Sequence, residues 1–114
     1  MLTIEALKNW GADTDEGLGR CYGNEALYLR LVKMVPAEKN FDKLEAAVGS
    51  GDGTAAFEAA HALKGVLGNL SLTPMTNICT PLTERLRAKT DTDCAPMVTE
   101  LLALKESLAA LCSE

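Results

Sequence analysis

Apolar residues recur along most of this chain at intervals of three and four, and this periodicity constrains the fold more than any other feature. Such spacing places the apolar side chains on one face of an α-helix. Short polar or glycine-containing turns separate the periodic segments. The pattern predicts helices over 2–10, 13–22, 25–35, 37–48, 54–70 and 73–89, and a last helix that follows Asp93 and carries its apolar stripe to Leu111.

The composition favours a bundle of these helices. Aromatic residues make up only 4% of the chain, so its core has to be built from leucine, alanine, valine and methionine. A chain of 114 residues is enough for one domain with one modest core. We therefore expect a single all-α domain over 1–114, an antiparallel four-helix bundle with its core over about 24–113 and short N-terminal helices forming a lid over 1–23.

Residue types at the segment boundaries give more local expectations. Short polar side chains lie at or just before the start of five segments and are the predicted N-caps: Thr3, Asn24, Asp52, Thr73 and Asp93. Residues 90–93 are expected to form a polar connection. In the helix over 25–35 we expect the buried stripe to consist of Ala26, Leu27, Leu31 and Met34, flanked by Tyr28, Leu29 and Val32.

Charge and cysteine content exclude several classes of protein. A formal net charge of −5 argues against a nucleic-acid-binding protein, which normally carries a basic patch. No apolar run approaches the roughly 18 residues of a membrane span, and no signal peptide opens the chain. The four cysteines contain no Cys-x-x-Cys pair, so we expect free thiols in a reducing cytoplasm rather than disulfides or a zinc site.

The segment over 54–70 contains the only histidine of the chain, His61. On a helix with about 100° per residue, its alanines, leucines and valine form one broad apolar face, while His61, Lys64, Gly65 and Gly68 lie on the opposite side. Each glycine costs a helix interior about 1 kcal/mol relative to alanine, so helix formation alone does not explain them. The pattern predicts an outward-facing histidine beside a cation and a bare patch of backbone.

These neighbours suit a phosphoryl carrier. A neutral imidazole is a nucleophile toward phosphorus, Lys64 can offset the charge of a phosphoryl group, and Gly65 leaves a gap for a partner's loop. The chain has no glycine-rich phosphate loop, no Walker lysine motif, no kinase nucleotide-binding signature and no acidic pair arranged for acid–base catalysis. We therefore expect a carrier that is not an enzyme and that uses no cofactor or metal of its own.

The same segment closely resembles the phosphoacceptor signature of histidine phosphotransfer (HPt) domains, a His-x-Leu-Lys-Gly core followed by small residues and a Leu-Gly-Leu-like end. Here it reads His61-Ala62-Leu63-Lys64-Gly65 and then Gly68-Asn69-Leu70-Ser71-Leu72. Ser71 replaces the usual glycine, which affects packing at the helix terminus more than chemistry. The resemblance also implies a four-helix bundle, in agreement with the periodicity.

The resemblance implies a role in a two-component phosphorelay. His61 would take a phosphoryl group from, or give it to, the aspartate of a response-regulator receiver domain, and a sensor or hybrid histidine kinase would be the other partner. The partner would supply the metal and the acid chemistry, and the carrier itself would be a monomer.

The resemblance assigns roles to three further residues. Relatives often place a polar side chain of the next helix against the histidine ring to orient it; Thr83 occupies that position and is shorter than in many relatives. Arg87, one turn later, would add positive charge. A plain surface position is an equally good interpretation of both. Phe57, one turn before His61, would border the docking surface together with the two glycines, the alternative being a core position.

Other functions remain open from the sequence. A bundle that docks a kinase or receiver domain as an adaptor or inhibitor would keep the fold without needing His61, although such a protein gains nothing from the His61–Lys64 pair. The chain is also compatible with an excised domain of a larger hybrid kinase, although Met1 and the complete helix pattern favour a stand-alone protein. A small enzyme is the least favoured class, because one histidine without a partner acid offers little catalytic chemistry.

Overall fold

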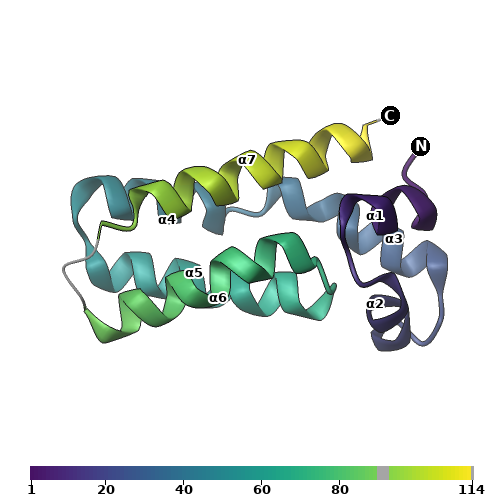
Figure 1. The fold of residues 1–114 in the computed structure, drawn as a ribbon, viewed down its shortest axis with the longest axis horizontal. Coiled ribbons are helices and arrows are strands. Elements are labelled where there is room, and N and C mark those ends of the chain that lie inside the picture. Colours follow the sequence, from purple (N-terminus) through teal and green to yellow (C-terminus); the bar gives the residue numbers. More distant parts are fainter. Residues whose placement is uncertain (90–92, 114) are drawn as a thin grey trace.

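The computed structural model describes residues 1–89 and 93–113, and every regular element within them is helical. In chain order these elements are α1 (Ile4–Trp10), α2 (Thr14–Arg20), α3 (Glu25–Met34), the 3₁₀ helix η1 (Val35–Ala37), α4 (Asn40–Ser50), α5 (Gly53–Asn69), α6 (Thr73–Ala88) and α7 (Ala95–Cys112) (Figure 1). The prediction of an all-α fold is confirmed.

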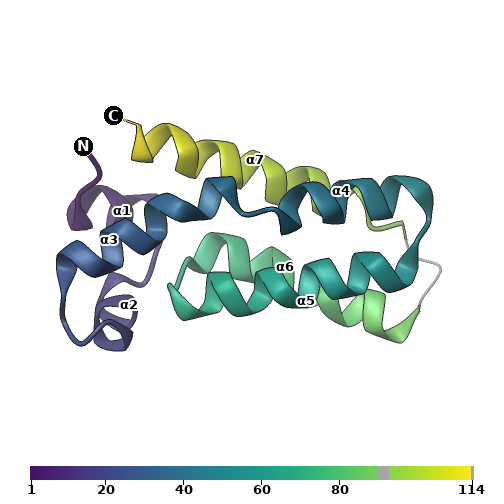
Figure 2. The same cartoon turned by 180° about the vertical axis from the view of Figure 1, so that it is seen from behind.

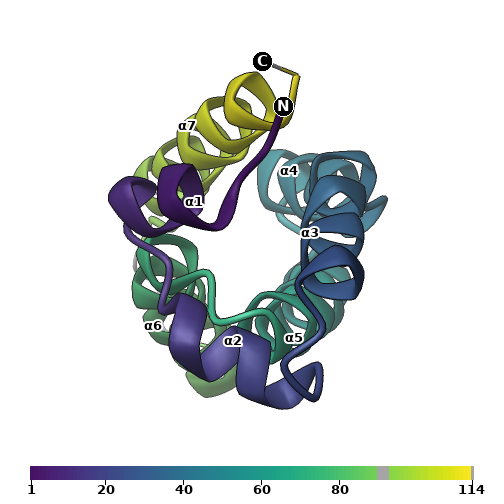
Figure 3. The same cartoon turned by 90° about the vertical axis from the view of Figure 1, so that its right-hand side faces the viewer.

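Helices α4, α5, α6 and α7 alternate in direction and surround a common axis, which makes an antiparallel four-helix bundle (Figures 1 and 3). α5 lies between α4 and α6, and α7 closes the ring by packing against α6 and α4. Figure 2 shows that α3, η1 and α4 follow one another along the same edge of the bundle. One side of the bundle is therefore a broken column, because Pro36 interrupts the helix between α3 and α4.

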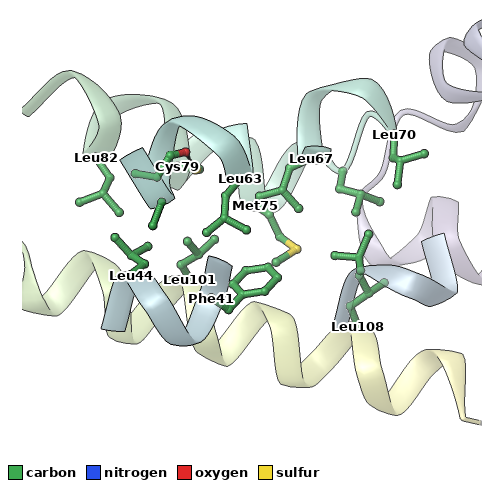
Figure 4. Close-up of a cluster of buried hydrophobic side chains, with 14 of the residues drawn as sticks. Phe41, Leu44, Leu63, Leu67, Leu70, Met75, Cys79, Leu82, Leu101 and Leu108 are labelled. Atoms are coloured by element: carbon green, nitrogen blue, oxygen red, sulfur yellow. Dashed lines mark hydrogen bonds between the residues drawn. The ribbon is translucent and has the colours of Figure 1, made fainter. Parts of the chain in front are cut away.

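Leucines from all four long helices meet in the centre of the bundle, together with Phe41 of α4 and Met75 of α6 (Figure 4). Full burial of one such side chain stabilises a fold by about 1.5–3 kcal/mol. The core thus consists of aliphatic side chains with few aromatic ones, as the composition predicts.

The predicted buried stripe of α3 is wrong in part, because Leu27 and Leu31 pack against the core but are only half-buried. The structure buries Tyr28 and Val32 completely and leaves Ala26 and Met34 exposed, with 63% of Met34 accessible to solvent. The two sides of this helix are similarly apolar, so periodicity does not determine which one faces inward. The tyrosine is buried because its hydroxyl donates a hydrogen bond of 2.8 Å to the carbonyl oxygen of Leu70, which satisfies its polar end.

Side-chain caps begin most of the helices where they are predicted. Thr3, Asn24 and Asp52 each accept a hydrogen bond from a backbone N–H of the following turn. Asp93 accepts a hydrogen bond from the backbone N–H of Ala95, but the N-cap of α7 is the next residue, Cys94, so this predicted cap is wrong by one residue. The rest of the predicted 90–93 connection lies outside the described residues. The predicted cap Thr73 is wrong, because this residue is already helical and its hydroxyl approaches the Ser71 carbonyl oxygen instead.

The two short N-terminal helices cover one end of the bundle (Figure 3). α1 is attached to α7, where the indole Nε1 of Trp10 donates to the Ser107 hydroxyl at 2.9 Å. α2 packs against α3, and Gly17 lies under the Tyr28 ring, where an added Cβ atom would come within 2.5 Å of the ring. α2 is thus held at the C-terminal end of α5, the helix that contains His61.

Candidate functional site

The packing of α5 determines the direction in which His61 points. One face of the helix is buried against α4 and α6, through Ala56, Ala59, Ala60, Leu63 and Leu67. His61 and Gly65 are exposed on the other face, and Lys64 and Gly68 lie half-buried beside them. The helical phase predicted for this segment is confirmed.

An aromatic stack supports the histidine ring. The ring of Phe57 lies 5.7 Å from that of His61, centroid to centroid, with an angle of 20° between their planes. The guanidinium carbon of Arg87 lies 5.1 Å from the centroid of the same Phe57 ring. The Nε atom of Arg87 also lies 3.5 Å from a carboxylate oxygen of Glu84. Phe57 therefore contacts both His61 and Arg87, and it is half-buried rather than part of the core.

The two glycines on the exposed side of α5 are not required by packing within the chain. A Cβ atom placed at Gly65 or at Gly68 would meet no atom within 4 Å beyond the local helix backbone and the residues next in the chain. Neither residue has the positive φ that would favour glycine. No contact in the described chain therefore requires glycine at these two positions. The missing side chains leave open space beside the histidine, which another molecule can occupy.

His61 borders an open hollow of about 260 Å³ on this face. Its lining includes Lys64, Gly65 and Gly68, as the sequence predicts, and Asn69 at the end of α5. Arg20, at the end of α2, also lines it and was not predicted as a site residue. No signal in the sequence identified it, because α2 reaches this position only through tertiary packing.

The role predicted for Thr83 is not supported by its position. Thr83 is completely buried, and its hydroxyl donates a hydrogen bond of 2.7 Å to the carbonyl oxygen of Cys79, one turn earlier in α6. This local bond uses the only proton of the hydroxyl. The His61 ring instead stacks on the ring of Phe57.

The residue that follows the C-terminal end of α5 has a backbone conformation that favours glycine. Ser71 has a φ of +54°, in the left-handed region that glycine adopts without strain. Its side chain is buried, and its hydroxyl donates to a carboxylate oxygen of Glu16 in α2 at 2.8 Å. Its carbonyl oxygen accepts from the backbone N–H of Asp13 at 3.0 Å. Ser71 therefore joins the end of α5 to α2.

Among the described residues, the other reactive side chains offer neither a metal site nor an activated thiol. Over residues 1–89 and 93–113, no group of three or more His, Cys, Asp or Glu side chains is arranged to hold a metal ion. Burial raises the pKa of the Cys79 and Cys112 thiols, which keeps them in the less reactive protonated form. None of the helices in the described part of the chain combines the length and apolarity that a bilayer crossing requires.

Comparison with known protein families adds an independent result. A family model described as "Hpt domain" matches residues 35–114. The match starts at η1 and includes the four bundle helices with the whole His61 segment, while α1, α2 and α3 precede it. No curated protein and no solved structure matches the chain.

Proposed function

The chain belongs to the Hpt domain family, and from this premise we propose that it carries a phosphoryl group on His61, exchanged with an aspartate of a receiver domain in a two-component phosphorelay. The carrier is a cytoplasmic monomer that works between a sensor or hybrid histidine kinase and a response regulator. It has no nucleotide site of its own.

The observation that carries this proposal is the open space around the histidine. His61 is exposed, and the glycines one and two turns later keep the adjacent helix surface free of side chains. A partner's active-site loop can therefore approach the ring closely. Phe57 borders this docking surface on the N-terminal side of His61, where it also supports the ring.

The transfer step needs only one histidine from the carrier. An electron pair of a ring nitrogen forms a bond to phosphorus, and the bond between phosphorus and the aspartate oxygen breaks, so the carboxylate leaves with its electron pair. The other ring nitrogen keeps its proton, so the ring becomes positively charged as the departing carboxylate becomes negatively charged, and the total charge is unchanged. The reverse step returns the group to an aspartate.

Two cations support the phosphorylated form in this proposal. Lys64 lines the hollow beside His61 and offsets the charge of the phosphoryl group. Arg87 adds positive charge from its position over the Phe57 ring, and the nearby carboxylate of Glu84 reduces the effect of that charge. Both act as helpers, because solvent screens charges at this exposed face.

A direct test is to incubate the full chain with receiver domains from the same organism, each phosphorylated with acetyl phosphate. The proposal predicts that at least one receiver transfers its phosphoryl group, and that the label on this chain is labile in acid and stable in base, as expected for phosphohistidine. Binding of a receiver without transfer of label would instead identify an adaptor or inhibitor. Label that is stable in acid would contradict a phosphohistidine carrier.

A further inference from the structure

A cation from outside the bundle reaches the hollow beside His61. Arg20 is the last residue of α2, and it lines this hollow together with His61, Lys64 and Asn69. The hollow has a volume of about 260 Å³ and is open to solvent. A phosphoryl group bonded to His61 therefore has room there, between a lysine from α5 and an arginine from α2.

Four contacts, three of them made by α2 or its N-cap Asp13, fix the position that brings Arg20 to the hollow. The Tyr28 hydroxyl donates to the Leu70 carbonyl oxygen at 2.8 Å, and Gly17 allows α2 to lie directly on the Tyr28 ring. The backbone N–H of Asp13 donates to Ser71 at 3.0 Å, and the Ser71 hydroxyl donates to Glu16 at 2.8 Å. Tyr28, Gly17 and Ser71 are buried in these contacts, so the position of α2 is part of the fold.

In the structure, the Arg20 side chain forms a weak ion pair with Glu16. Its Nη2 atom lies 3.5 Å from Oε1 of Glu16, and the two side chains are 51% and 53% exposed. An ion pair with this geometry and exposure contributes little to stability. The same oxygen of Glu16 accepts the hydrogen bond from Ser71, so this carboxylate keeps a partner if the guanidinium moves away.

We propose that Arg20 is a phosphoryl-binding residue of this carrier, and that its guanidinium moves from Glu16 to the phosphoryl group when His61 is phosphorylated. A guanidinium presents a planar fork of N–H donors that matches two phosphate oxygens, and a phosphoryl group carries more charge than a carboxylate. The charge of the phosphoryl group is thus shared between α5 and α2. This inference rests on the proposed function, because it requires phosphate on His61.

Phosphoramidate provides a test without a receiver domain. The ring nitrogen forms a bond to phosphorus, the P–N bond of the donor breaks, and ammonia leaves with the electron pair of that bond. The label on the full chain is then followed by ³¹P NMR as a function of pH and by its decay over time. Wild type is compared with Arg20→Gln, Arg20→Lys and Arg30→Gln, the last being an exposed arginine of α3 that does not line the hollow.

A cation beside phosphohistidine favours its more negative protonation state. Arg20→Gln should therefore raise the pH midpoint of the ³¹P signal by several tenths of a unit and shorten the half-life of the label roughly threefold, because the protonated form is the acid-labile one. Arg20→Lys should lie between this variant and wild type, because lysine keeps the charge without the fork. Arg30→Gln should match wild type.

Glu16→Gln gives a second, opposite effect. The amide keeps an oxygen for the Ser71 hydroxyl but no longer competes for Arg20, so the midpoint should fall below that of wild type. In the double variant with Arg20→Gln, the effect of Glu16→Gln should be smaller, because the two residues act through one contact. A merely structural role of Arg20 predicts neither the shift in midpoint nor this dependence.

The possible failures are distinct. If wild type takes the label and Arg20→Gln has the wild-type midpoint and half-life, Arg20 does not bind the phosphoryl group and the inference is wrong while the proposed function stands. If wild type takes no label from phosphoramidate or from a receiver, the proposed function fails and the inference fails with it. Melting curves of each variant show whether the fold is retained.

Discussion

At the scale of single residues, the His61 ring contacts Phe57 rather than the Thr83 hydroxyl that was expected to orient it. Phe57→Ala removes the ring against His61, and we expect transfer to slow by roughly two- to tenfold, the range that corresponds to the energy of one aromatic pair. Thr83→Val keeps the shape of the side chain and removes only the hydroxyl, which contacts Cys79, so it should transfer at the wild-type rate. Transfer rates from a phosphorylated receiver check both predictions. A large decrease in the rate of Thr83→Val would show that the Thr83 hydroxyl takes part in transfer.

We expect Lys64 to assist the phosphorylated state without being essential to it. A partly exposed cation contributes about 0–1 kcal/mol, so Lys64→Ala should shorten the phosphohistidine lifetime by up to about fivefold at low salt and by less at high salt. Lys43→Ala, an exposed lysine of α4, is the matched control and should behave as wild type. Lifetimes of Lys64→Ala equal to those of wild type at both salt concentrations would remove Lys64 from the mechanism.

The predictability of these residues from sequence depends on how each is placed. Lys64, Gly65 and Gly68 share a helix with His61, so the helical period alone puts them together. Thr83 is on the next helix, and its inward rotation follows from how α6 packs. Arg20 is brought to the hollow by contacts between residues more than 40 positions apart, which no local pattern encodes.

At the scale of the elements, substitutions on the exposed side of α5 should affect stability and phosphoryl transfer differently. Gly65→Ala should raise the free energy of unfolding by up to about 1 kcal/mol, because the new methyl group meets nothing and alanine is the better helix former. Gly65→Gln should keep the helical signal and melt no lower than wild type, yet lose transfer from a receiver domain, because the longer side chain fills the docking surface. Phosphoramidate should still label His61 in this variant.

A second helical glycine provides the control for this experiment. Gly49 of α4 also has open space around its Cβ position and does not line the hollow, so Gly49→Gln should transfer normally. Wild-type transfer by Gly65→Gln would mean that the partner docks elsewhere. If Gly65→Gln unfolds, the glycine is required for helix packing rather than for docking.

At the scale of the whole molecule, Tyr28 links α2 to the end of α5 and gives the fold a pH dependence. Burial, together with the charges of Cys21 and Asp13, raises the pKa of Tyr28 to about 12, above the value of about 10 in an unfolded chain. The resulting stability is fully present below pH 10 and is lost as pH rises from about 10 to about 12, because only the unfolded chain then releases the proton. The free energy of unfolding should fall less steeply over this range in Tyr28→Phe; equal slopes in denaturant titrations at several pH values would contradict this account.

The general architecture follows from the sequence more fully than the orientation of its parts. The caps, the turns and the apolar stripes predict seven helices and their approximate ends, and the structure places them in the expected bundle. The inward face of α3 was predicted incorrectly, because it depends on a tertiary hydrogen bond from Tyr28 to Leu70. The alignment of α3, η1 and α4 along one edge of the bundle likewise depends on tertiary packing, since η1 and α4 lie against α7.

The central claim is that His61 itself carries the phosphoryl group, and replacing it is the most direct test. Glutamine at this exposed position keeps a polar side chain and disturbs no buried contact, so His61→Gln should show wild-type circular dichroism and a melting temperature close to wild type. Both proteins are incubated with the same phosphorylated receiver domain, and the label on this chain is measured. The account predicts acid-labile label on the wild type and none on His61→Gln. Label on the folded His61→Gln variant at the wild-type level would contradict it.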